Sequence, residues 1–140
     1  MRIVLDTNVV VAAMRSPAGA SAELLRLGRV GDIDVLASAT LCLEYEAVCQ
    51  REEHRKAAGL SKRDVGVFLD AVIGIVTAVD VWFSWRPQLA DDADDEMVLD
   101  AAVNGRADVL ATFNLRHFTD ARRRFGVAVL TPGDTLRRLP

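Results

Sequence analysis

The chain has 140 residues, a formal net charge of -3, and 51% hydrophobic and 26% charged residues. These values predict one globular domain over residues 1–140, large enough to bury a core. No apolar run approaches the roughly 20 residues that span a bilayer. Without a signal or transit peptide pattern we expect a cytoplasmic protein, and the negative charge argues against one that simply coats nucleic acid.

Apolar runs alternate with helical patterns along the chain. We expect strands at 3–5, 34–37, 79–83, 109–112 and 127–130. We expect helices at 9–14, 22–30, 41–51, 61–76 and 96–105 and another beginning at Thr131, with 52–56 as a charged, exposed connection. Strands that alternate with helices predict an α/β fold with a parallel sheet covered on both faces.

The first strand ends on a carboxylate, Asp6. In parallel α/β sheets ligands bind at the carboxyl edge of the strands, where the following helices begin. An ionised Asp at that edge needs a partner, and a metal ion is one candidate. The alternative is that Asp6 only caps the helix that follows, and this stretch alone leaves both interpretations open.

Two further carboxylates lie on or beside apolar helix faces. Glu44 borders the face that contains Leu41 and Val48, and an ordinary flanking position is its simplest interpretation. Asp95 is harder to dismiss, because Val98, Leu99 and Ala102 follow it at i+3, i+4 and i+7 and place it on the inward face. The opposite, solvated face is predicted to carry Glu96, Asp100 and Asn104.

A doubly wound sheet would bring Asp6, Glu44 and Asp95 to the same edge. Three carboxylates that close repel one another unless a divalent cation neutralises them. Mg2+ or Mn2+ fits an all-oxygen ligand set, and such sites activate water against phosphodiester bonds.

Five motifs in this order resemble the PIN domain family, in particular the VapC-like bacterial toxin components of toxin–antitoxin pairs. The resemblance covers essentially the whole chain and rests on residues 4–9, 16–19, 43–48, 92–99 and 107–114. It implies a three-layer α/β/α sandwich with a central parallel sheet of four to five strands. It also implies a Mg2+- or Mn2+-dependent ribonuclease, with RNA as substrate, a cognate antitoxin protein as partner, and a homodimer.

The resemblance assigns the metal-ligand roles to Asp6, Glu44 and Asp95. Many family members have a fourth acid where this chain has Asn114, and relatives often have Asp where it has His117. Asn114 is therefore expected to complete the catalytic set as a weak ligand or a residue that orients water, with one negative charge missing. The residues expected to support the site are Thr7, Asn8, Asp92 and Thr112, and those expected to contact RNA are Arg15 and Arg116.

Two other functions are compatible with these residues. One is a degenerate PIN domain that binds RNA or an antitoxin without cleavage. The other is a phosphatase with Asp6 as nucleophile, although such enzymes usually have a second Asp two residues later, where this chain has Asn8. Metal-dependent RNA cleavage that EDTA abolishes would separate the nuclease from the binder.

Overall fold

A parallel five-stranded sheet forms the centre of the protein, which we describe from a computed structural model over residues 1–84 and 93–140. The strand order is β3-β2-β1-β4-β5, and all four neighbouring pairs are parallel. The strands are β1 (Arg2–Leu5), β2 (Asp34–Ala37), β3 (Val76–Ala78), β4 (Val109–Ala111) and β5 (Ala128–Leu130). The predicted α/β fold with a central parallel sheet is confirmed.

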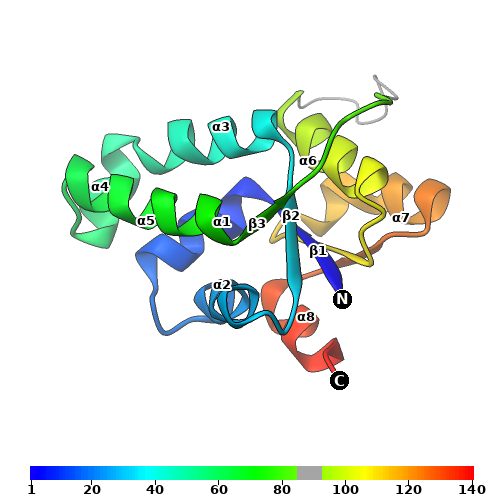
Figure 1. The fold of residues 1–140 in the computed structure, drawn as a ribbon, viewed down its shortest axis with the longest axis horizontal. Coiled ribbons are helices and arrows are strands. Elements are labelled where there is room, and N and C mark those ends of the chain that lie inside the picture. Colours follow the sequence, from blue (N-terminus) through cyan, green and yellow to red (C-terminus); the bar gives the residue numbers. More distant parts are fainter. Residues whose placement is uncertain (85–92) are drawn as a thin grey trace.

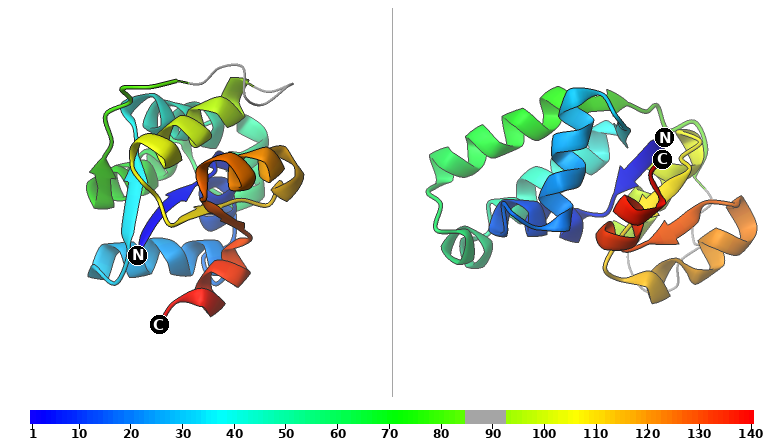
Figure 2. Two further views of the ribbon diagram at one scale, coloured as in Figure 1. Left: turned by 90° about the vertical axis from the view of Figure 1, so that its right-hand side faces the viewer. Right: turned by 90° about the horizontal axis from the view of Figure 1, so that it is seen from below.

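Helices flank this sheet (Figures 1 and 2). In the described part of the chain they are α1 (Thr7–Arg15), α2 (Ala20–Val30), α3 (Ala39–Cys49), α4 (Glu52–Ala58), α5 (Lys62–Ile75), α6 (Ala93–Asn104), the 3-10 helix η1 (Leu115–Phe118), α7 (Thr119–Phe125) and α8 (Pro132–Arg138). None of the helices described is long and apolar enough to cross a membrane.

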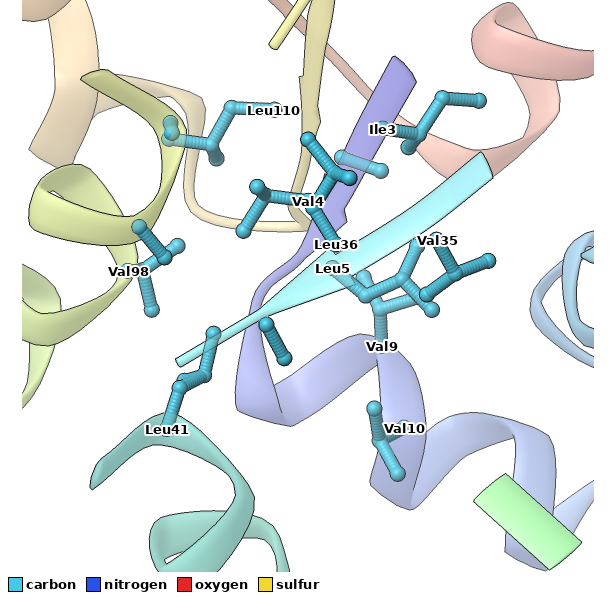
Figure 3. Packing of buried hydrophobic residues seen from close by; sticks show 14 of the residues in the cluster. Ile3, Val4, Leu5, Val9, Val10, Val35, Leu36, Leu41, Val98 and Leu110 are labelled. Carbon is cyan, nitrogen blue, oxygen red and sulfur yellow. The ribbon is translucent and has the colours of Figure 1, made fainter. Parts of the chain in front are cut away.

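Successive residues of β2 show how the two faces of the sheet are covered. A Cβ atom on Gly28 of α2 would lie 2.7 Å from Cγ2 of Val35, whereas one on Gly105, just after α6, would lie 3.1 Å from Cδ1 of Leu36. Because side chains alternate between the faces of a strand, α2 and α6 lie on opposite faces. Both faces are apolar, and Figure 3 shows Leu36 and its buried neighbours between the helices.

The chain reverses its direction across the sheet beside β1. It runs outward from β1 through β2 to β3, then returns to place β4 on the other side of β1. The backbone N–H of Asp6 donates to the carbonyl of Ala111 at 2.9 Å, which ties the carboxyl ends of β1 and β4 together. A crevice at the carboxyl end of such a switch point is where open α/β sheets bind ligands.

The prediction of a strand at 79–83 is wrong. The edge strand is β3, which begins directly after α5 and pairs Val76 with Val35. Val79 still donates its N–H to the carbonyl of Ala37, but Trp82 and Phe83 are 79% and 66% exposed. Their apolar, β-prone composition resembled a strand, but β2 ends at Ala37, and residues 1–84 and 93–140 provide no other strand for them to pair with at this edge.

The connection predicted at 52–56 is instead the helix α4. Acids occupy its first turn and bases its last, which complements the helix dipole, and Gly59 ends it in the left-handed conformation at φ 71°. Lys56 and Glu52 also form an i,i+4 ion pair at 2.9 Å. Its charged composition hid it from a search for apolar periodicity, and η1 and α7 were likewise not predicted.

Candidate functional site

Asp6 lies at the carboxyl edge of the sheet, where two hydrogen bonds hold its side chain. Its Oδ1 accepts the backbone N–H of Thr7 at 2.8 Å, and its Oδ2 accepts the hydroxyl of Thr112 at 2.6 Å. The side chain therefore caps α1, as one interpretation predicted, and it also lines the cleft at the carboxyl ends of β1 and β4. Thr112 contributes its hydroxyl as expected, whereas Thr7 contacts Asp6 through its backbone.

The burial of Asp6 changes its acidity. Desolvation, with a smaller contribution from the nearby Asp95, raises the pKa of this carboxyl from 3.8 to about 6, although the hydrogen bond from Thr112 lowers it. Only 5% of Asp6 is exposed. Ionisation of Asp6 in the folded protein is therefore unfavourable, and a bound cation would stabilise its negative charge.

Asp95 begins the inward face of α6, as its spacing predicted, and is 6% exposed. Its Oδ2 lies 2.7 Å from Nδ1 of His117, which follows β4 on η1. Because an ionised carboxylate only accepts hydrogen bonds, Nδ1 donates to it. His117 therefore orients Asp95 from the position where an acid had been expected.

Glu44 enters the site from α3. The next residue, Tyr45, is buried and donates its hydroxyl to the carbonyl of Leu5 at 2.5 Å, which fixes α3 to the end of β1. Glu44 itself is half-buried and faces the same cleft as Asp6 and Asp95. The position of Glu44 beside the apolar stripe of α3 was compatible with an ordinary flanking residue. In the structure this position faces the cleft.

These side chains line one cleft of about 490 Å³. Of the predicted site residues, it brings together Asp6, Thr7, Asn8, Arg15, Glu44, Asp95 and Asn114. Thr112 lies directly behind it through its bond to Asp6. Arg116 is exposed and outside its lining, and Asp92 lies outside the described residues.

Asn114 lies at the open side of the cleft. Its backbone N–H donates to the hydroxyl oxygen of Thr112 at 2.9 Å, so the same threonine anchors both Asn114 and Asp6. The residue is exposed, and its side chain makes no hydrogen bond to any residue of the described ranges. Its amide is thus available to a ligand and is not used to hold the carboxylates in place.

Sequence reasoning did not place Arg51, His54 or Phe113 in this region, and all three line the cleft. It named His117 but did not predict its contact with Asp95. Arg51 and His54 belong to the start of α4, a helix that was not predicted. No sequence pattern marks Arg51 or His54 as part of the site. Phe113 lies within the motif at residues 107–114, directly after Thr112.

The donor set fits a hard divalent cation. Within the described ranges, the acids of the cleft supply oxygen ligands, and Oδ1 of Asn8, which also lines it, is buried and has no hydrogen-bond partner there. No three His, Cys, Asp or Glu side chains of residues 1–84 and 93–140 are already arranged as a metal-binding cluster. Binding would therefore require side chains such as Glu44 to reorient towards Asp6.

The prediction that Glu96, Asp100 and Asn104 face solvent is wrong. Glu96 and Asp100 are 3% and 5% exposed. Segment 81–84 crosses this side of α6, where Asn104 Oδ1 accepts the N–H groups of Trp82 and Phe83 at 3.0 Å each. Ser84 donates its hydroxyl to Asp100 at 3.1 Å. A helical pattern shows which face is apolar but not what covers the polar one.

Comparisons with known proteins give a family and a fold. The family model of the PIN domain matches residues 2–116. Among solved structures, a chain of the crystal structure of VapBC2 from Rickettsia felis bound to a DNA fragment from their promoter matches with a TM-score of 0.62 and 16% identity. The match covers 93% of this chain and 97% of that chain, and at this identity it shows a shared fold. No curated protein matches the sequence.

Proposed function

Because the chain belongs to the PIN domain family, we propose that it is a metal-dependent endoribonuclease whose active site is the cleft around Asp6, Glu44 and Asp95. The observation that carries the proposal is the convergence of these acids. They come from the end of β1, from α3 and from α6, and all three line one cleft at the switch point of the sheet. Nothing in the packing of an apolar core requires acids from three separate elements to meet there.

Each side chain has a distinct task in this proposal. Asp6, Glu44 and Asp95 would hold a Mg2+ or Mn2+ ion, which when bound would activate the attacking water and offset charge that develops on the phosphate. Thr112 and His117 orient Asp6 and Asp95 through hydrogen bonds of 2.6 and 2.7 Å. Such outer partners fix the direction in which ligand oxygens point.

The remaining cleft residues act on the substrate. Asn114 has a free amide at the open side, placed to hydrogen-bond either the attacking water or a phosphate oxygen. Arg15 is exposed at the end of α1 and lines the cleft, where its guanidinium would bind a phosphate of the RNA backbone. Above a pH of about 6 the raised pKa of Asp6 leaves its carboxylate ionised and able to take a ligand role.

We further propose that the protein is the toxin of a toxin–antitoxin pair, that it functions as a homodimer in the cytoplasm, and that its cognate antitoxin blocks RNA cleavage. One solved structure with the same fold is a crystal structure of VapBC2 bound to a DNA fragment from their promoter. Expression of this protein alone should inhibit cell growth, and co-expression of its antitoxin should relieve that inhibition. Cleavage by the purified protein should fall as the antitoxin is added in equimolar steps.

The test is cleavage of a mixed-sequence RNA by protein stripped of metal and then supplied with Mn2+ or Mg2+. We expect cleavage with metal, none with EDTA, and none by Asp95→Asn. The matched control is Asp70→Asn, which makes the same chemical change at an exposed position of α5 and should cleave like wild type. Cleavage by Asp95→Asn at the wild-type rate would contradict the proposal, and sequencing of the products would identify the cleavage site.

A specific observation favours a second candidate, a PIN domain that binds RNA without cleavage. Asn114 and His117 stand where the family often has acids, so the site has fewer negative charges to hold a cation. In that case wild type and Asp95→Asn would bind RNA equally and neither would cleave it. The Mn2+ assay above therefore separates the two candidates directly.

A further inference from the structure

Phe113 is an exposed aromatic side chain beside the acids of the cleft. Its exposed fraction is 51%, and it lines the same cleft as Asp6, Glu44 and Asp95. A single exposed apolar side chain is normal for a protein surface and by itself indicates nothing. The position of Phe113 within the site is what distinguishes it.

The backbone on both sides of Phe113 is anchored to the site. Thr112 is fully buried and donates its hydroxyl to Asp6, and the same hydroxyl oxygen accepts the N–H of Asn114. The aromatic ring is therefore carried between two fixed residues instead of on a long loop. A ring held this way can contact a ligand with little loss of conformational entropy.

Two guanidinium groups line the same cleft as this ring. Arg15 is eight residues beyond Thr7 on α1, which places its backbone about 12 Å along the helix from Thr7. Arg51, at the start of α4, is also exposed and lines the cleft. The cleft thus combines acids, an aromatic surface and two guanidinium groups. This arrangement suits a strand with bases to stack and phosphates to neutralise.

We propose that Phe113 stacks on an unpaired base of the RNA nucleotide next to the scissile phosphate and so selects which nucleotide occupies that position. This inference rests on the proposed ribonuclease function. A paired base inside a helix has both faces covered by its neighbours, so an aromatic side chain cannot stack on it. Phe113 therefore determines which nucleotides can reach the acids.

The first measurement is binding of fluorescently labelled single-stranded RNA octamers, followed by anisotropy in EDTA so that no RNA is cleaved. We expect Phe113→Leu to weaken binding roughly tenfold, because base–aromatic stacking contributes that order of affinity. Phe113→Trp, which keeps an aromatic face, should bind at least as tightly as wild type. The matched control is Leu115→Ala, an exposed apolar side chain two residues farther on that does not line the cleft.

The second measurement uses octamers that each lack one base, with the abasic position moved along the strand. If Phe113 stacks on a base, one abasic RNA should bind wild type and Phe113→Leu equally, because the partner of the ring is missing. An effect of Phe113→Leu that persists with every abasic octamer would overturn the inference, as would unchanged binding by Phe113→Leu. Absence of any RNA binding would overturn it as well.

Cleavage with Mn2+ then separates the inference from the proposed function. Both the inference and the proposed function would be supported by three results together. Wild type should cleave single-stranded RNA, it should leave fully paired RNA uncut, and Phe113→Leu should raise the KM roughly tenfold. Cleavage by Phe113→Leu with an unchanged KM would reject the inference alone. Binding that depends on Phe113 without cleavage of any RNA would reject the ribonuclease and leave the stacking role in place.

Discussion

The substitution Asp6→Asn in metal-free protein tests the electrostatics of the cleft. Burial raises the pKa of Asp6 from 3.8 to about 6, so the folded protein holds this proton more tightly than the unfolded chain. At about 1.4 kcal/mol per pH unit, the difference corresponds to about 3 kcal/mol of unfolding free energy. This contribution is complete below about pH 3.8 and is lost as the pH rises through about 6.

Asn is a good isosteric substitute, because it caps a helix about as well as Asp and carries no charge at any pH. We expect the free energy of unfolding of wild type, measured by urea titration in EDTA, to fall relative to Asp6→Asn by up to about 3 kcal/mol between about pH 4 and 7. The exposed Asp70→Asn serves as control and should follow wild type. A constant difference between wild type and Asp6→Asn across this range would refute the reasoning.

Three further predictions concern the neighbours of Asp6. In Asp95→Asn the unfolding free energy without metal should stay the same or increase, because one cause of the raised Asp6 pKa is removed; a marked decrease in urea titrations would make Asp95 a structural residue. His117→Ala should weaken Mn2+ binding by calorimetry roughly tenfold, and His117→Asn, which keeps a donor, should restore part of it. Asn114→Asp should tighten Mn2+ binding roughly tenfold, about 1.4 kcal/mol, since it adds a charged oxygen at the open side of the cleft; equal or weaker binding would mean that Asn114 is no vacant ligand position.

The elements that sequence patterns predicted well are those whose own residues determine their environment. The run 3–5 is fully buried in the centre of the sheet, as three consecutive branched or large apolar residues indicated. The Ser-x-x-Asp spacing of Ser61 and Asp64 is local and is enough to form the reciprocal capping box that begins α5. Asp95 likewise lies on the buried face of its helix because its apolar neighbours recur at i+3, i+4 and i+7.

The features that were missed depend on segments distant in sequence. His117 contacts Asp95 across 22 residues, and no local pattern pairs a histidine with an acid at that separation. Asn104 binds segment 81–84, most of which was predicted to be a strand, so the contacts of Asn104 could not be predicted. Phe113 and Arg51 line the cleft only because β4 and α4 end and begin beside it.

The most direct test of the proposed active site is a calorimetric Mn2+ titration of metal-free protein above pH 7, where Asp6 is ionised. Wild type and the control Asp70→Asn should give the same saturable binding heat. Asp6→Asn, Glu44→Gln and Asp95→Asn should each bind at least tenfold more weakly, about 1.4 kcal/mol, because all three acids are proposed ligands. Binding that none of these three substitutions weakens, or no saturable heat from wild type, would contradict a metal site in this cleft.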